Sequence, residues 1–142
     1  MARIKLELPE KFYFSCELNV RVTDLNYGNH LGNDAVLSLM HEARVQWLKS
    51  IGASEMDFFG VSMIMADVAI VFRSEGFLGN QLRCEVQPAG FSRTGYDLFY
   101  RFTNLTTQKP MAEAKTGMVC FDYTERKVKP LPEKFAEMFR NA

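Results

Sequence analysis

The sequence predicts an α+β domain in which one long helix packs against one face of an antiparallel sheet. Three observations support this prediction: an alternating apolar segment near the start, one helical pattern after it, and four further strand patterns separated by turn residues. A chain of 142 residues has the usual size of one domain and can bury well over half of its surface. We therefore expect one core and one domain over residues 1–142.

The first two elements are a strand and the long helix. Over residues 12–22 the even-numbered positions are apolar, a period of two that is typical of a half-buried strand. A loop rich in Gly and Asn follows. Apolar residues then recur at steps of three or four, which predicts a helix over about residues 34–51, with Asn33 or Asp34 as the N-cap and Gly52 at its end. Apolar residues cover much of the circumference of this helix, so we expect it to be largely buried.

The remaining segments indicate short connections between consecutive strands, and hence antiparallel pairing. Ser54 begins a capping-box pattern, which predicts a short helix that ends at Gly60. Pro130 and Pro132 precede a predicted C-terminal helix over residues 133–140. Four strands, separated by turns that contain Gly, Asn or Pro, are predicted over residues 62–73, 81–87, 96–103 and 111–121.

The composition excludes several classes of partner. Seventeen basic residues balance seventeen acidic ones, so no overall charge attracts nucleic acid or an anionic membrane surface. Cys16, Cys84 and Cys120 have no metal-type spacing, and their odd number argues against a closed disulfide framework. No segment approaches the eighteen consecutive apolar residues of a membrane span, and the N-terminus lacks the apolar region of a secretory signal. We expect a protein of the reducing cytoplasm, without a metal or other cofactor.

The loop before the helix carries the most specific motif in the chain. Residues 24–33 read DLNYGNHLGN, and residues 42–44 read EAR on the predicted helix. Together with residues 72–75 (FRSE) and 91–96 (FSRTGY), this pattern resembles the 4-hydroxybenzoyl-CoA thioesterase and acyl-thioester hydrolase family over about residues 12–123. The resemblance implies a hotdog fold, an antiparallel sheet wrapped around one central helix. It also implies hydrolysis of an acyl-CoA or acyl-carrier-protein thioester by a homodimer or homotetramer with its pocket between subunits.

One position departs from the family pattern. The second carboxylate of the family's D-x-D, which is the usual catalytic group, falls on Asn26, and an amide cannot accept a proton as a base. The loop is similar to that of the plant acyl-carrier-protein thioesterases, which supplies a histidine, here His30, and places Glu75 at the matching strand end. The resemblance therefore assigns the base to His30 or Glu75. Asn26 would orient the water or the carbonyl, or alternatively form an Asx-turn.

Thioester hydrolysis requires a positioned water, a base, and hydrogen-bond donors for the oxyanion. Amides at a helix N-terminus suit the last requirement, so we expect the Asn33 N–H to bind the oxyanion and Gly32 and Tyr27 to contact the substrate. His30 has the alternative role of a structural hydrogen-bonder, because a loop histidine often serves that purpose. Asp24 is expected to fix the backbone of the loop.

Further candidates lie outside this loop. Asp67 lies within an apolar stretch, where burial without a partner would raise its pKa. We consider a catalytic role for it in the pocket, against a contact at a sheet edge or between subunits. Arg93 and Thr94 could bind a coenzyme A phosphate through charge-assisted hydrogen bonds, or belong to a solvated hairpin. Glu42 and Arg44 are expected to form an ion pair around the helix.

The loss of the family carboxylate leaves a second function open. A non-catalytic module could bind acyl thioesters with the same amides at the helix N-terminus. A hotdog hydratase or dehydratase is less expected, because the chain has no arrangement of the His-x-Pro type.

Overall fold

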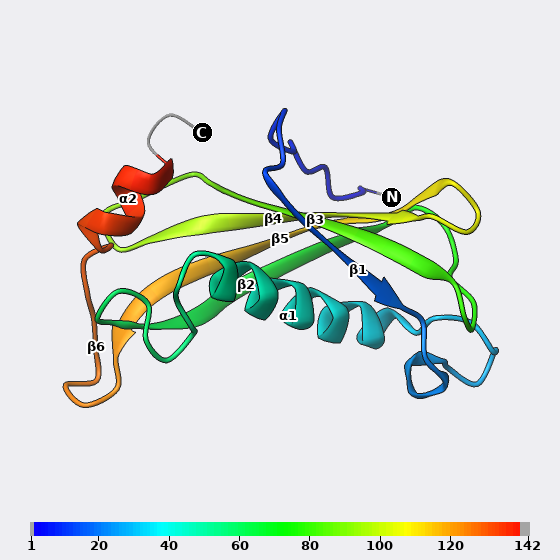
Figure 1. Ribbon diagram of the computed structural model, residues 1–142, viewed down its shortest axis with the longest axis horizontal. Helices are drawn as coiled ribbons and strands as arrows, with labels where there is room; N and C mark the ends of the chain where they lie inside the picture. Colours follow the sequence, from blue (N-terminus) through cyan, green and yellow to red (C-terminus); the bar gives the residue numbers. More distant parts are fainter. Residues whose placement is uncertain (1, 140–142) are drawn as a thin grey trace.

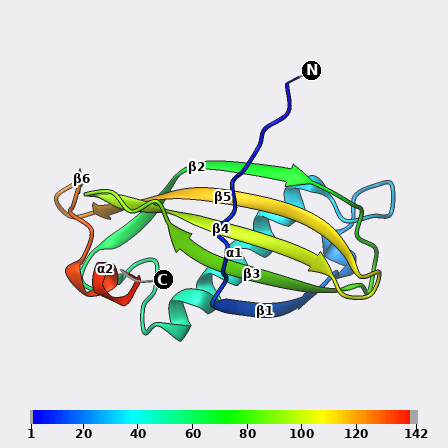
Figure 2. The same ribbon diagram turned by 90° about the horizontal axis from the view of Figure 1, so that it is seen from above.

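The computed structural model describes residues 2–139, in which six strands form one antiparallel sheet and the long helix α1 lies along one of its faces (Figure 1). The strands lie in the order β1-β3-β4-β5-β2, and β6 pairs with β5 (Figure 2). The predicted α+β fold, with an antiparallel sheet around one long helix, is confirmed. No helix within residues 2–139 is long and apolar enough to cross a membrane. The elements are β1 (Phe14–Asn19), the 3-10 turn η1 (Val22–Asp24), α1 (Asn33–Ser50), β2 (Ser62–Phe72), β3 (Gln81–Ala89), β4 (Gly95–Asn104), β5 (Lys109–Asp122), β6 (Lys127–Val128) and α2 (Glu133–Phe139).

The helix α1 ends as the sequence predicts. Gly52 has a positive φ of 77°, a conformation that costs glycine little because it has no Cβ. The Gly52 N–H donates to the Lys49 carbonyl at 3.1 Å, and the Ala53 N–H donates to the Leu48 carbonyl at 2.9 Å. These two bonds form a Schellman motif, which satisfies carbonyls that have no partner inside the helix.

The start of α1 differs from the prediction. The N-cap is Gly32, whereas we expected Asn33 or Asp34, and no side chain caps the helix. The Gly32 N–H donates to the Asp24 carbonyl at 2.9 Å, so the preceding loop crosses close to the first turn. A Cβ on Gly32 would lie 2.6 Å from Asp34 Oδ1. The close approach of this loop, which no local pattern reveals, therefore moves the cap by one or two residues.

Residues 54–60 form a turn, so the predicted short helix is wrong. The local capping contact exists, because the Asp57 N–H donates to Ser54 Oγ at 3.0 Å. However, Phe58 and Val61 exchange main-chain hydrogen bonds across a tight turn, and the Phe58 side chain is completely buried. Burial of the Phe58 ring stabilises the turn more than the local capping contact stabilises a helix. The two-residue strand β6 was also not predicted, and Arg140, the expected end of the last helix, lies outside the described residues.

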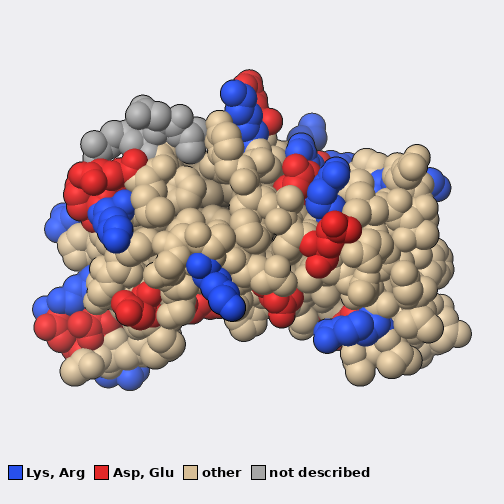
Figure 3. All heavy atoms as spheres, viewed as in Figure 1, with Lys and Arg blue, Asp and Glu red and all other residues tan. Residues whose placement is uncertain are grey.

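The two faces of the sheet differ in chemistry. Along β5 the buried residues alternate with partly exposed ones, and the buried side faces α1. On the other face, ion pairs connect neighbouring strands; they join Arg73 to Glu113 at 2.6 Å, Arg101 to Glu85 at 2.9 Å, and Lys115 to Asp67 at 2.8 Å and to Asp97 at 3.2 Å. Figure 3 shows residues of both charges interspersed on one side of the molecule, without a large area of a single sign.

One end of the molecule is closed by an aromatic cluster around α2. The Phe135 side chain is completely buried. Six rings surround it at centroid distances of 4.6–6.5 Å; they belong to Trp47, Phe58, Phe59, Phe91, Tyr96 and Phe139. The loop that precedes α1 lies at the opposite end of the sheet (Figure 1).

Candidate active site

Asp24 fixes the loop that precedes α1. Its side chain is 5% exposed. Asp24 Oδ2 accepts a hydrogen bond from the Arg21 N–H at 2.8 Å, and Oδ1 accepts one from Arg21 Nη2 at 3.3 Å. The Asp24 carbonyl accepts the Gly32 N–H. The expected structural role of Asp24 is therefore confirmed, and the Gly32 amide is already occupied.

Asn26 closes a turn within this loop. Asn26 Oδ1 accepts the Gly28 N–H at 2.9 Å and the His30 N–H at 3.4 Å. The Asn26 N–H donates to the His30 carbonyl at 2.9 Å. This is the Asx-turn that the sequence offered as one of two roles for Asn26. Tyr27, at the tip of the turn, is fully exposed.

His30 lies where the loop meets the connection between β2 and β3. The backbone of His30 pairs with Phe77 in an isolated antiparallel bridge, and the Leu31 N–H donates to the Gly76 carbonyl at 2.7 Å. The two rings of His30 and Phe77 meet edge to face, with their centroids 6.4 Å apart. These contacts join two segments that are distant in the sequence, and they bring His30 close to Glu75.

A pocket of about 280 Å³ opens at this junction. His30, Asn33 and Glu75 all line it, together with Arg73 and the helix residue Val36. Asn33 is the first residue of α1, so its N–H has no acceptor inside the helix and can bind an anionic oxygen. The remaining lining residues, to which the sequence assigned no catalytic or substrate-binding role, are Leu31, Phe72, Ser74, Gly76, Met111 and Ala112.

Asp67 is not part of this pocket. It lies on the outer face of β2, where its side chain is 63% exposed and pairs with Lys115. The hydrogen bond from Lys115, together with one from the Gly117 N–H, holds the pKa of Asp67 below its ordinary value. Of the two alternatives that the sequence left open, the structure agrees with the contact at a sheet edge, because β2 is an edge strand and Asp67 points away from the core.

Arg93 and Thr94 lie at the opposite end of the sheet from His30, in the loop between β3 and β4 (Figure 1). The Arg93 carbonyl accepts the Leu131 N–H at 2.8 Å, and the Thr94 carbonyl accepts the Cys120 N–H at 2.9 Å. The Arg93 side chain is exposed. Within one chain, Arg93 and Thr94 therefore do not contribute to the pocket.

Known proteins share this architecture. A family model described as the thioesterase-like superfamily matches residues 20–139. The chain belongs to this superfamily. A 1,4-dihydroxy-2-naphthoyl-CoA hydrolase from Synechococcus elongatus is 26% identical over 106 residues, which cover 72% of this chain and 76% of that protein.

Solved structures of thioesterases superpose on nearly the whole chain. A 1,4-dihydroxy-2-naphthoyl-CoA thioesterase from Synechocystis has a TM-score of 0.81 at 22% identity, and the match covers 90% of this chain and 96% of that one. A thioesterase from Thermus thermophilus, complexed with coenzyme A and Zn, has a TM-score of 0.78 at 23% identity, with coverages of 92% and 99%. The hotdog fold is confirmed, and this superfamily member is a thioesterase, a hydrolase that acts on thioester bonds.

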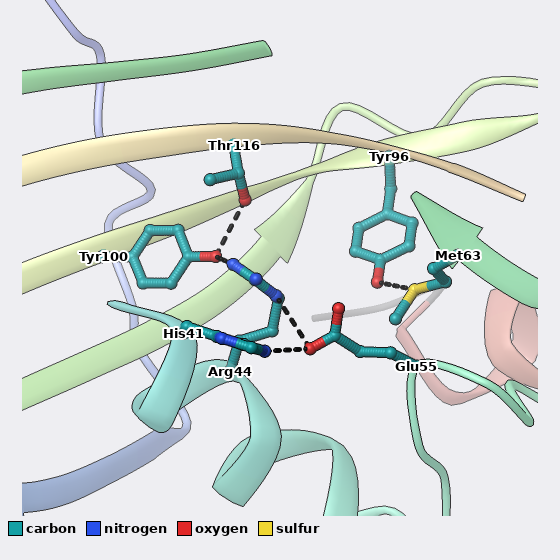
Figure 4. Close-up of polar contacts among 7 residues, drawn as sticks. All are labelled: His41, Arg44, Glu55, Met63, Tyr96, Tyr100 and Thr116. Carbon is teal, nitrogen blue, oxygen red and sulfur yellow. Dashed lines mark hydrogen bonds and ion pairs between the residues drawn. The ribbon is translucent and has the colours of Figure 1, made fainter. Parts of the chain in front are cut away.

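The thioesterase contains a buried polar network that the sequence did not reveal. Arg44, which is 6% exposed, donates through Nη1 to Tyr100 Oη at 3.0 Å, and Tyr100 contacts Thr116 Oγ1 at 2.8 Å (Figure 4). Glu55 Oε1 lies 3.6 Å from Arg44 Nε and 2.8 Å from His41 Nε2. Burial raises the pKa of the Tyr100 phenol, against the opposing effect of Arg44, so Tyr100 stays neutral.

This network corrects the expected ion pair between Glu42 and Arg44. Glu42 accepts a hydrogen bond from Gln46 Nε2 at 2.7 Å on the helix surface, whereas Arg44 points into the core. Residues two positions apart on a helix do not face each other. Arg44 therefore finds its carboxylate in the loop after the helix, at Glu55.

The cysteines of the thioesterase are poor candidates for a nucleophile. All three are free thiols. Burial raises the pKa of Cys16, with a further contribution from Glu42, and burial raises the pKa of Cys120; both values are about 11. Because the thiolate is the reactive form, these groups are largely unreactive at neutral pH.

Proposed function

We propose that this thioesterase hydrolyses acyl-CoA esters in the pocket between the N-terminus of α1 and the connection from β2 to β3, with His30 as the general base. One observation carries the proposal: His30, Asn33 and Glu75 come from a loop, a helix and a strand end, and they line the same pocket. A base, an oxyanion donor and a carboxylate are thus collected around one space. These are the groups that hydrolysis of a thioester by water requires.

The proposed reaction uses the Asn33 N–H as the oxyanion donor. His30 takes a proton from a water molecule, and the hydroxide attacks the carbonyl carbon of the thioester. The negative charge that forms on the carbonyl oxygen accepts a hydrogen bond from the Asn33 amide, for which such donors contribute about 2.7–4 kcal/mol. When the carbon–sulfur bond breaks, protonated His30 returns its proton to the thiolate, which leaves a free acid and a free thiol.

Asn26 and Glu75 have supporting roles in this proposal. Asn26 Oδ1 already accepts two main-chain N–H groups, so Asn26 acts by shaping the turn that presents His30. The Glu75 carboxylate orients the water or the imidazole from the other side of the pocket. Glu75 is also the alternative base, because a carboxylate can accept the same proton.

Coenzyme A is the proposed carrier of the acyl group. A relative named as a hydrolase of a CoA ester and a structural neighbour complexed with coenzyme A support this choice over an acyl-carrier protein. The cytoplasm is the proposed location, supported by the three free thiols, because disulfides are rare in reducing compartments.

A second copy of the chain is proposed to complete the site. The strand β2 is a sheet edge, and edge strands are commonly covered by another element or chain. Met65, Val68 and Phe72 are 41%, 41% and 40% exposed, and each lies opposite a buried residue of β5, so they are on the side of α1. A two-fold axis at this edge would place the sheets of the two copies side by side in opposite orientations. It would bring Arg93 of the second copy towards the end that carries His30.

The activity is tested by free-thiol release from a panel of aromatic, short, medium and long acyl-CoAs. The proposal expects turnover of at least one member. The variant Asn26→Asp should retain activity after His30→Ala is added, because it restores a carboxylate beside the helix N-terminus, where negative charge is stabilised. Binding of acyl-CoA without thiol release by the wild type would instead identify a non-catalytic module.

The assembly is tested by sedimentation. The chain has a mass of 16.3 kDa, and the proposal expects a species of twice or four times that mass at micromolar concentration. Charged substitution of Val68 at the exposed edge should shift the population towards the single chain. A wild-type protein that sediments as a single chain would contradict the shared site.

A further inference from the structure

A bulge in β5 interrupts the alternation of buried and exposed residues beside the pocket. Met111 and Ala112 are consecutive, yet they are only 2% and 1% exposed. The pairing between β4 and β5 shifts here, because Phe102 lies opposite Ala112 while Thr103 lies opposite Pro110. Met111 is therefore the extra residue of the bulge, which turns its side chain towards α1. Bulges redirect side chains in this way and are frequent near active sites.

The redirected side chain forms part of the pocket floor. Met111 lines the pocket together with the buried residues Leu31 and Val36. A Cβ added to Gly76 would lie 3.3 Å from Met111 Sδ and 3.3 Å from Leu31 Cβ, so these three residues are in close contact. His30, by contrast, is only half-buried and lies nearer the opening.

The main chain of Met111 also holds the strand end that carries Glu75. The Met111 carbonyl accepts the Arg73 N–H at 2.8 Å and the Ser74 N–H at 3.2 Å. The backbone of Met111 is thus anchored to the segment that carries Glu75. A residue fixed in this way can limit how far an acyl group reaches past the proposed reacting groups.

We propose that Met111 sets the depth of the acyl pocket and restricts this thioesterase to compact acyl groups, such as short chains or small ring systems. This inference rests on the proposed function of the same pocket. The part of this pocket that one chain forms has a volume of about 280 Å³, at the lower limit of ligand pockets, which usually measure about 300–1,000 Å³. An unbranched methionine closes the floor and adapts its shape to the bound group, whereas a smaller residue would open the floor towards the core.

The variant Met111→Ala tests this assignment. The measurement is the ratio of kcat/KM for decanoyl-CoA to that for butanoyl-CoA, which should rise about 10- to 200-fold, the range in which apolar pockets discriminate by size. The matched control is Met118→Ala, which removes the same atoms from the same strand. Met118 is 1% exposed and does not line the pocket, so the ratio should not change. An unchanged ratio in folded Met111→Ala, or an equal rise in Met118→Ala, would overturn the proposal.

If Met111→Ala does not fold, a substitution that narrows the pocket tests the assignment instead. Gly76→Ala adds a methyl group against Met111 Sδ and narrows the floor, so the same ratio should fall. A ratio that stays constant or rises would contradict the assignment.

Binding separates this inference from the proposed activity. S-alkyl-CoA thioethers of increasing length cannot be hydrolysed, and their dissociation constants report pocket depth without turnover. Met111→Ala should lower the dissociation constants of the long thioethers relative to those of the short ones. A wild type that binds thioethers with this size dependence but releases no thiol would refute the activity and keep the depth assignment. Thiol release by a wild type whose thioether binding does not depend on size would support the activity and refute the depth assignment.

Discussion

The two ends of the sheet are built in different ways. At the end that carries the pocket, a loop rich in Gly and Asn is held by hydrogen bonds that main-chain N–H groups donate to the side-chain oxygens of Asp24 and Asn26. At the other end, six aromatic rings surround the buried ring of Phe135. Apolar burial supplies most of the stability of a fold, so the aromatic end stabilises the molecule. At the polar end His30, Asn33 and Glu75 line a pocket.

The residues proposed to react and the residues that stabilise the fold therefore lie at opposite ends of the sheet. Substitutions at the pocket end should change the rate with little effect on unfolding, and substitutions at the aromatic end should do the opposite. Four substitutions test the separation, in order of decreasing effect.

His30→Ala should lower kcat by about 10²- to 10⁴-fold, the usual effect of removing a general base. The free energy of unfolding should change by less than about 1 kcal/mol, because the side chain is only half-buried. The control is His41→Ala, which removes the other histidine of the sequence from an exposed position on α1. If Glu75→Gln abolishes turnover while His30→Ala retains it, Glu75 is the base.

Phe135→Ala should destabilise the fold by about 3–5 kcal/mol, as expected for truncating a buried aromatic residue. Denaturant titration measures this loss. At a temperature where the variant remains folded, its kcat should equal that of the wild type. A large fall in kcat without a loss of stability would show that the aromatic end takes part in the reaction.

Arg93→Ala tests whether the two ends meet across a pair of chains. If the Arg93 guanidinium binds a phosphate of coenzyme A, its removal costs about 1.5–3 kcal/mol of binding. KM for acyl-CoA should then rise about 10- to 100-fold while kcat stays nearly constant. Arg83→Ala, at another exposed arginine, serves as the control. A fall in kcat at constant KM would refute the phosphate contact.

Asp67→Asn, midway between the ends, should cost less than about 1 kcal/mol, because exposed ion pairs contribute little. The hydrogen bond from Lys115 lowers the pKa of Asp67 in the folded state. The Asp67–Lys115 pair therefore stabilises the fold above pH 3.8, the ordinary pKa of this carboxyl. This stabilisation is lost as the pH falls through the lower pKa that Asp67 has in the folded state. Denaturation curves of wild type and variant should converge in acid. A difference that grows at low pH would contradict the assigned ion pair.

Local patterns predicted the long helix and most strands because burial there follows the period of each element. The segment that begins at Ser54 shows the limit of such patterns. Its hydroxyl makes the expected capping contact, yet the buried ring of Phe58 turns the chain before a helix can form. The Gly32 cap likewise depends on a loop that returns to the helix from Asp24.

The candidate site was predicted in part. The family motif identified His30, Asn33 and Glu75, which the fold brings together through pairing of Leu31 with Gly76. The sequence left Asp67 between a pocket role and a contact at a sheet edge, because it does not show which strand lies at the edge of the sheet. The sequence did not distinguish Met111 from the methionines that fill the core, because a bulge, which depends on the partner strand, reverses the direction of its side chain.

The ion pairs on the outer face of the sheet have a consequence for assembly of the fold. In the native alignment Glu113 and Lys115 face solvent, while Ala114 and Thr116 are buried. A slip of one residue along β5 would exchange these sets, and burying unpaired charges costs several kcal/mol each. That penalty exceeds the small stabilisation from any one surface pair. During folding, these residues therefore act against misaligned pairing of β5 with its neighbours β4 and β2.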